Sequence, residues 1–310
     1  MTQAAMTGAV RKTPAASRLT RQRARAAWLF LAPSLLVLIL VAAWPVLRTF
    51  AYGFTDANLA DPGAAALIGF ENYRFLLTDP VWWRSVWNTV FFTVVAVSLE
   101  MVIGTIIALA LNAAVPWRGG LRAAVLIPWV IPTVVAAQMW GWMYHDIHGV
   151  LNEILVGLGL IEAKLAWTAD PDLAIWAVIF TDVWKTTPFV ALLVLAGLQM
   201  VPRDILEAAK MDGVSGFKLF FGVILPLIRS AVLVAALFRI LDSLRIFDVI
   251  YVLTGNNERT MSMSVYARQQ LVDFQDVGFG SAATSLLFGI VALVSVVYLM
   301  LGRLELMRED

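Results

Sequence analysis

The amino-acid sequence predicts an all-α integral membrane protein with six transmembrane helices. Of its 310 residues, 60% are hydrophobic and only 15% are charged, whereas a soluble domain is about 45–50% apolar and about 25% charged. A soluble fold could not bury such an excess, but membrane lipid accepts apolar side chains on the protein surface. The apolar segments recur along the whole chain, so we expect one membrane domain at 27–303 and no soluble one.

Six segments are apolar over roughly the 20 residues that a spanning helix needs. They cover residues 27–52, 86–114, 123–144, 173–200, 224–252 and 277–302. The first is longer than the about 7–15 apolar residues of a signal peptide, which predicts a span that is not cleaved. We expect a disordered basic cytoplasmic tail at 1–26 and a short cytoplasmic tail at 304–310.

The basic residues predict the orientation in the plasma membrane. With six spans, both termini lie on one side, together with the basic tail and the two loops that begin near Arg118 and Arg203. That side has more than twice the Lys and Arg of the other side. Because these residues concentrate in cytoplasmic loops, we expect both termini in the cytoplasm.

Several kinds of chemistry find no support in the sequence. The chain has no cysteine, which excludes disulfides and thiol nucleophiles. Its only histidines, His145 and His148, are interpreted as an ordinary loop pair, so no metal site is expected. There is no phosphate-binding loop, and Glu100 is interpreted as a buried, hydrogen-bonded acid. We therefore expect no catalytic residue, no cofactor on this chain and no nucleic-acid partner, but contact with membrane lipid.

The loop at 201–226 predicts two short helices on the cytoplasmic face. Pro202 suits a helix N-terminus, and Asp204 and Glu207 place negative charge near it. Gly213 can end the helix in a left-handed conformation, and Ser215 can cap the next one. A small alanine face lets another surface approach closely, which is typical of a docking element.

This loop resembles the EAA loop of ABC importer permeases. The matching positions are Glu207, Ala208, Ala209, Asp212, Gly213, Leu225 and Pro226. Val223 departs mildly from the isoleucine usual in the family. The resemblance implies the type I, maltose-permease-like fold, in which the loop is held by a separate ATPase subunit. ATP and magnesium would then bind to partner chains.

Other segments are similar to the carbohydrate branch of this family. They are 182–189 in the fourth span, 238–242 and 247–254 in the fifth, and 278–282 in the sixth. Asn256 and Asn257 depart from the family pattern in the outer loop. The resemblance is to the first permease of maltose-type importers, with a trehalose importer as the expected match. It implies a second homologous permease, two ATPase subunits and an extracytoplasmic sugar-binding protein as partners.

The fifth span carries four charged residues at spacings of three, from Arg239 to Asp248. If these side chains faced the lipid, each would raise the free energy of membrane insertion by about 2.5–3.5 kcal/mol. They must therefore pair, face the bundle or contact water. One alternative is a self-neutralising ladder along the helix, and the other is a wall of the sugar pathway. The candidate pathway residues are Asn88, Gln138, Trp140, Trp184, Lys185, Asp242, Arg245, Asp248 and Tyr251.

A rival interpretation is a secondary transporter driven by an ion gradient. Such transporters often have inverted repeats. No internal repeat is visible in this sequence, and the loop at 201–226 would have no role in such a protein. We therefore favour a permease subunit that carries a sugar and couples to separate ATPases.

Overall fold

The described part of the chain is predominantly helical, which confirms the predicted fold class. The computed structural model describes residues 18–61, 65–113 and 117–306. Within these ranges the only β contacts are two isolated bridges, Thr55 to Leu67 and Asn58 to Asp276. Residues up to 51 form one unit and residues from 52 onward form a second.

The described part of the first unit is one long helix with a widened turn, basic at its start and apolar thereafter. It consists of α1 (Arg18–Leu38), a π-helical turn (Ile39–Ala43) and α2 (Trp44–Tyr52). The turn comes just before Pro45, whose ring would collide with the carbonyl four residues earlier in a regular helix. Helix already begins at Arg18, so 18–26 of the expected disordered tail are helical, and the rest of that tail lies outside the described residues.

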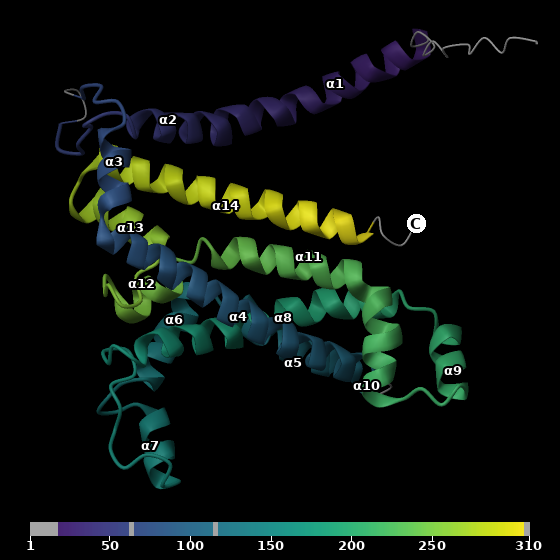
Figure 1. Cartoon of the computed structure of the whole chain (residues 1–310). Helices are drawn as coiled ribbons and strands as arrows, with labels where there is room; N and C mark the ends of the chain where they lie inside the picture. Colours follow the sequence, from purple (N-terminus) through teal and green to yellow (C-terminus); the bar gives the residue numbers. More distant parts are fainter. Residues whose placement is uncertain (1–17, 62–64, 114–116, 307–310) are drawn as a thin grey trace, which may run out of the picture. The chain divides into compact units, whose positions relative to one another are not determined.

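Two long helices form the centre of the second unit. They are α4 (Pro80–Asn112) and α8 (Ala174–Gln199), which lie side by side (Figure 1). Asp79 caps α4 by accepting from the Val81 N–H at 2.8 Å. Gly104 permits the close approach of α8, because a Cβ at this position would lie 2.8 Å from the Val190 side chain. These packed helices hold the buried residues that surround the site described below.

The predicted third span, 123–144, is not one straight helix. It is α5 (Arg118–Val130) followed by α6 (Thr133–Met143), with a bend of 88° between them. Pro132 lies at the break, and the residue before it, Ile131, is extended with ψ 130°. A proline disfavours the helical conformation at the preceding residue, which accounts for the break. Counting this pair as one span, the described chain has six candidate spans, as predicted.

The fifth span is shifted towards the N-terminus relative to the prediction of 224–252. It runs from Gly216 to Ser243 through α10 (Gly216–Leu219), a π-helical turn (Phe220–Ile224) and α11 (Leu225–Ser243). The chain then unwinds and resumes as α12 (Asp248–Thr254). The π-helical turn again precedes a proline, Pro226. The break after Ser243 separates the charged residues that the sequence places on one continuous helix.

The rest of the second unit consists of short helices and the sixth span. They are α3 (Glu71–Thr78), α7 (Val150–Gly157), α9 (Arg203–Met211), α13 (Met263–Arg268) with a π-helical turn at Gln269–Asp273, and the sixth span α14 (Val277–Leu306). α7 and α9 lie at opposite ends of this unit (Figure 1). Helix α14 extends into the expected tail 304–310, of which 307–310 lie outside the described residues.

Candidate functional site

A buried arginine joins three helices in the interior of the second unit. Arg239 on α11 is 2% exposed, and Glu100 on α4 is fully buried. The Arg239 Nε donates to Glu100 Oε2 at 2.5 Å, and Nη2 donates to Glu100 Oε1 at 2.8 Å. This two-point geometry matches the guanidinium fork to a carboxylate. Glu100 also accepts from the Thr186 hydroxyl at 2.7 Å, so the interpretation of Glu100 as a buried, hydrogen-bonded acid is confirmed.

Two more carboxylates complete the surroundings of Arg239. Its Nη2 donates to Asp182 Oδ2 on α8 at 2.9 Å, and its Nη1 donates to Asp242 Oδ2 at 2.5 Å. Nη2 also reaches the Ser243 hydroxyl at 3.1 Å. The guanidinium is therefore engaged on all its nitrogens. Breaking such a buried pair would leave uncompensated charge in the interior.

The alternative of a ladder along the fifth span is wrong beyond its first pair. Arg239 and Asp242 pair as expected, but Arg245 Nε donates to the Leu241 carbonyl at 3.0 Å. Asp248 lies in the first turn of α12, beyond the break in the helix. The chief partners of Arg239 come instead from α4 and α8. The pairing of Arg239 with residues on other helices depends on tertiary packing, which cannot be predicted from residue spacing along one helix.

A cavity of about 490 Å³ adjoins this cluster. Its lining residues come from the break between α5 and α6, from α8, and from the end of α11 up to the start of α12: Trp129, Thr133, Asp182, Lys185, Thr186, Phe189, Phe238, Arg239, Leu241, Asp242, Ser243, Arg245, Ile246, Phe247, Asp248 and Val249. The two helix breaks thus lie at the cavity wall. Irregular backbone at membrane depth is tolerated where it lines such a space.

The cavity combines aromatic faces with hydrogen-bonding groups. Trp129 and Phe189 are stacked, with ring centroids 5.7 Å apart and an interplanar angle of 20°. Phe238 meets Phe189 edge-on at 6.3 Å. Opposing charges are balanced among the lining residues, with three carboxylates and three cationic side chains. Such a wall suits a polar ligand with apolar faces better than an ion.

Four of the nine candidate pathway residues line the cavity: Lys185, Asp242, Arg245 and Asp248. The aromatic lining residues were not among the candidate pathway residues, although three of them lie within the segments 182–189, 238–242 and 247–254: Trp129, Phe189, Phe238 and Phe247. Phe189 lies one helical turn after Lys185 and so shares its helix face. This spacing is the sequence signal that could have identified Phe189 as a lining residue.

The other candidates lie elsewhere. Asn88 donates to the backbone carbonyls of Glu258 at 3.0 Å and Met261 at 3.1 Å, and so holds the loop between α12 and α13. Trp140 and Trp184 meet edge-on at 5.5 Å in a separate aromatic cluster. Tyr251 stacks on Phe247 at 5.3 Å, with Arg268 over its ring, and Gln138 is exposed on α6.

The loop at 201–226 has the predicted helix and helix end. Helix α9 begins directly after Pro202 and contains Glu207, Ala208 and Ala209. Asp212 is the C-cap, and Gly213 is left-handed with φ 78°. The Val214 N–H donates to the Ala209 carbonyl and the Gly213 N–H to the Lys210 carbonyl, both at 3.0 Å. This is a Schellman motif, and it needs the positive φ that glycine allows.

The rest of the loop differs from the expectation in one detail. Ser215 occupies the N-cap position of α10, but its side chain makes no capping hydrogen bond, so that expectation is wrong. The adjacent Gly216 is also left-handed, with φ 56°. Met211 and Phe217 are highly exposed, at 87% and 85%. Leu225 and Pro226 begin α11.

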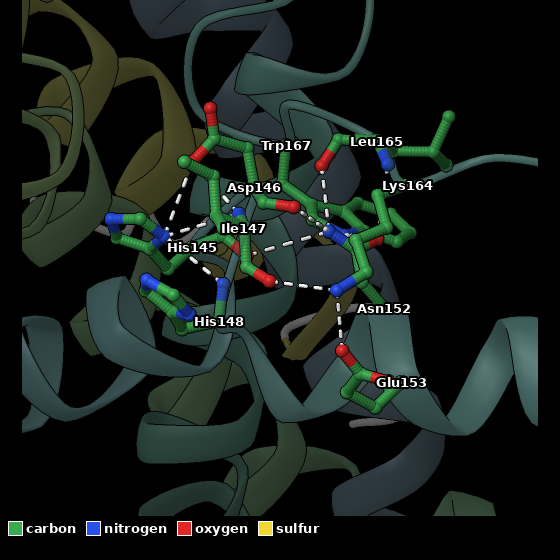
Figure 2. A network of polar contacts seen from close by, with 9 residues as sticks. All are labelled: His145, Asp146, Ile147, His148, Asn152, Glu153, Lys164, Leu165 and Trp167. Carbon is green, nitrogen blue, oxygen red and sulfur yellow. Dashed lines mark hydrogen bonds and ion pairs between the residues drawn. The ribbon is translucent and has the colours of Figure 1, made fainter.

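On the opposite end, a buried amide organises the loop between α6 and α8. Figure 2 shows Asn152 at the centre of this network. Its Nδ2 donates to the Leu165 carbonyl at 2.9 Å, and its Oδ1 accepts from the Leu165 N–H at 3.1 Å and from Trp167 Nε1 at 3.0 Å. Lys164 pairs with Glu153 nearby. The described residues contain no cluster of three or more groups able to hold a metal ion.

Comparison with known proteins identifies the family. Residues 100–305 match the binding-protein-dependent transport system inner membrane component family. The chain belongs to this family. It is therefore a membrane-spanning transport component and not an enzyme, and the resemblance noted in its sequence is confirmed.

Relatives match along almost the full chain. A trehalose/maltose transport system permease protein MalF of Thermococcus litoralis is 40% identical, over 93% of this chain and 97% of the relative. The trehalose transport system permease protein SugA of Mycobacterium tuberculosis is 39% identical, over 89% and 88%. The sulfoquinovosyl glycerol transport system permease protein SmoG of Agrobacterium fabrum is 36% identical, over 89% of each chain.

The fold matches a solved importer. A chain of a bacterial ABC transporter involved in alginate import superimposes with a TM-score of 0.79, at 19% sequence identity. The match covers 93% of this chain and 99% of the other. At this identity the likeness establishes the fold, which is the ABC importer permease fold that the sequence predicts.

Proposed function

We propose that this chain is the permease subunit of an ATP-driven importer for an uncharged sugar, with trehalose as the first candidate. The observation that carries the proposal is the cavity, whose stacked Trp129 and Phe189 lie beside charged groups of balanced sign. Sugars bind through aromatic faces and a few placed polar groups. Two of the relatives are named for trehalose, which supports this sugar first.

Coupling to ATP would run through the loop at 201–226. Glu207 and the Ala208–Ala209 pair lie on α9, which has no buried residue in this chain. The exposed Met211 extends the apolar surface available to a partner. We propose that α9 docks on a separate ATPase subunit, and that ATP and magnesium bind to this partner. Gly213 would fix the direction in which the chain leaves the end of α9. Closure of the ATPases would then move the spans as rigid bodies.

In this arrangement both termini and α9 would lie in the cytoplasm, and α7 would lie outside. The partners would be a second homologous permease, two ATPase subunits and an extracytoplasmic sugar-binding protein received by the outer loops. A bacterial alginate ABC transporter of this fold has been solved in complex with an alginate pentasaccharide-bound periplasmic protein, which supports this arrangement. An ion-gradient-driven transporter is the weaker candidate, because the family is one of binding-protein-dependent systems.

Purification of the tagged chain in mild detergent, followed by mass spectrometry, tests the assembly. We expect an ATPase and a second permease to copurify. Uptake of radiolabelled trehalose into proteoliposomes that contain this assembly and its binding protein tests the transport. Uptake should require internal ATP and persist when ion gradients are collapsed. Recovery of the chain alone, with uptake that follows an ion gradient, would overturn the proposal.

A further inference from the structure

One side chain in the cavity has a hydrogen-bonding capacity that the protein leaves unused. Lys185 on α8 lines the cavity and is only 8% exposed. Within the described part of the chain its amino group makes no hydrogen bond and no ion pair within 4.0 Å. A protonated lysine amino group has three hydrogen-bond donors and no acceptor, so it can be satisfied only by an acceptor on another group. The Lys185 amino nitrogen is not among the fully buried atoms without a partner in the described chain, so it is open to the cavity, where a ligand that accepts a hydrogen bond can reach it.

The neighbouring acids form no ion pair with Lys185 and bond to Arg239 instead. Asp182 lies one turn earlier on α8, and its Oδ2 accepts from Arg239 at 2.9 Å. Asp242 Oδ2 accepts from Arg239 at 2.5 Å. Arg239 therefore occupies one oxygen of each carboxylate. Neither acid forms an ion pair with Lys185 within 4.0 Å, so the Lys185 donors remain available to a ligand.

The other cation of the cavity is placed differently. Arg245 is exposed, and its Nε already donates to the Leu241 carbonyl at 3.0 Å. Solvent can satisfy its remaining donors at little cost. Lys185 is thus the buried cationic group of this wall with donors to spare.

The aromatic pair lies one helical turn from Lys185. Phe189 follows it by four residues and therefore lies on the same helix face. Phe189 stacks on Trp129, which is 44% exposed. A sugar ring placed against this pair would bring its hydroxyl or ring oxygens towards the lysine. Balanced lining charges leave no excess positive charge for an anionic sugar.

From these observations we infer that Lys185 donates a hydrogen bond to an oxygen of an uncharged disaccharide held in the cavity, beside Trp129 and Phe189. This inference rests on the proposed function and adds a residue that retains the sugar in transit. Without Lys185, sugar released by the binding protein would leave the cavity more often before the assembly turns inward. ATP hydrolysis would continue, because α9 and the Arg239 cluster would be unchanged.

The test compares variants in the full assembly of permeases, ATPases and trehalose-loaded binding protein in proteoliposomes. The readout is the ratio of trehalose imported to ATP hydrolysed, which a general folding defect would not change. We expect Lys185→Met to lower this ratio about tenfold, and Lys185→Arg to retain most of it. Thr187→Val is the matched control, since this buried hydroxyl on the same helix has no partner among the described residues and lies outside the cavity.

Each result is decisive. If Lys185→Met assembles poorly, Lys185→Gln replaces it, because the ratio needs only the complexes that do form. A wild-type ratio in the neutral variant would overturn the role of Lys185 while leaving sugar import intact. Failure of the wild-type assembly to import trehalose or maltose would overturn the proposed function and the role of Lys185 with it.

Discussion

Arg239 and Glu100 are 139 residues apart in the sequence and form a two-point ion pair in the interior, with Nε–Oε2 at 2.5 Å and Nη2–Oε1 at 2.8 Å. The pair ties α11 to α4, and Asp182 extends it to α8. Three spans are thus joined at one guanidinium. In a membrane, where apolar packing against lipid offers little driving force between helices, such polar contacts contribute directly to helix association.

Replacing Arg239 by methionine should therefore destabilise the protein strongly. The change leaves Glu100 and Asp182 buried without their cation, and removing one partner of a buried pair costs about 3–5 kcal/mol. Thermal unfolding in detergent measures the effect. Asp242→Asn is the control, because the Asp242 side chain is 69% exposed and Arg239 keeps its other two carboxylates. Equal stability of Arg239→Met and the wild type would show that the cluster is dispensable for folding.

The spans were predictable because hydropathy acts locally. Each long apolar segment became helical, although the third and the fifth are interrupted. Gly213 ended α9 as expected, since a Schellman motif involves only neighbouring residues. The breaks were only partly predictable. Pro132 marks a break in the third span, but the 88° bend depends on what the two halves pack against.

The site was less predictable than the fold. The charges of the fifth span were visible, and their cost in lipid required partners. Spacing along one helix suggested partners three residues away, whereas Glu100 and Asp182 come from other helices. Which helices lie beside α11 is a property of the packed bundle. The aromatic wall at Trp129 and Phe189 was missed for the same reason.

Replacing Asn152 by aspartate should loosen the loop between α6 and α8. Asn152 is fully buried and donates through Nδ2 to the Leu165 carbonyl at 2.9 Å. A carboxylate has no N–H to donate, so it would face backbone carbonyls as a buried acceptor. Limited proteolysis of the purified protein in detergent should show faster cleavage between α6 and α8. Asn58→Asp is the matched control, because Asn58 is exposed and acts as an acceptor for the Ala60 N–H. Equal cleavage in both variants would contradict the role of Asn152.

The pairing of Tyr266 with Asp79 predicts sensitivity to alkaline pH. Tyr266 on α13 is buried and donates to Asp79 at the start of α4. Burial first, and then the hydrogen bond and the negative charge of Asp79, raise the pKa of Tyr266. Because the pKa is higher in the folded state than the ordinary value of about 10, the stabilisation is complete below pH 10 and is lost as pH rises towards the folded pKa.

Tyr266→Phe supplies the comparison for this pH dependence. Phenylalanine has no group that ionises at this position. The thermal midpoint of the variant should therefore fall less than that of the wild type between about pH 9 and about pH 11, a range around the ordinary tyrosine pKa. At neutral pH it should be less stable by about 1–3 kcal/mol, because the carboxylate of Asp79 loses a donor. Parallel alkaline curves for the two proteins would exclude Tyr266 as the titrating group.

Gly213→Pro should abolish sugar uptake while leaving the chain in the membrane. Proline cannot adopt the φ of 78° found here, and it lacks the N–H that bonds to the Lys210 carbonyl. Helix α9 would then leave the bundle at a different angle, although no span is altered. Gly120→Ala is the control, since a Cβ there meets nothing within 4 Å. The measurement is uptake together with copurification of the ATPase, and Glu207→Ala should lower both in the same way. Normal uptake by Gly213→Pro and Glu207→Ala would mean that α9 does not transmit the energy of ATP hydrolysis, because the two changes disrupt the helix end and its exposed acid independently.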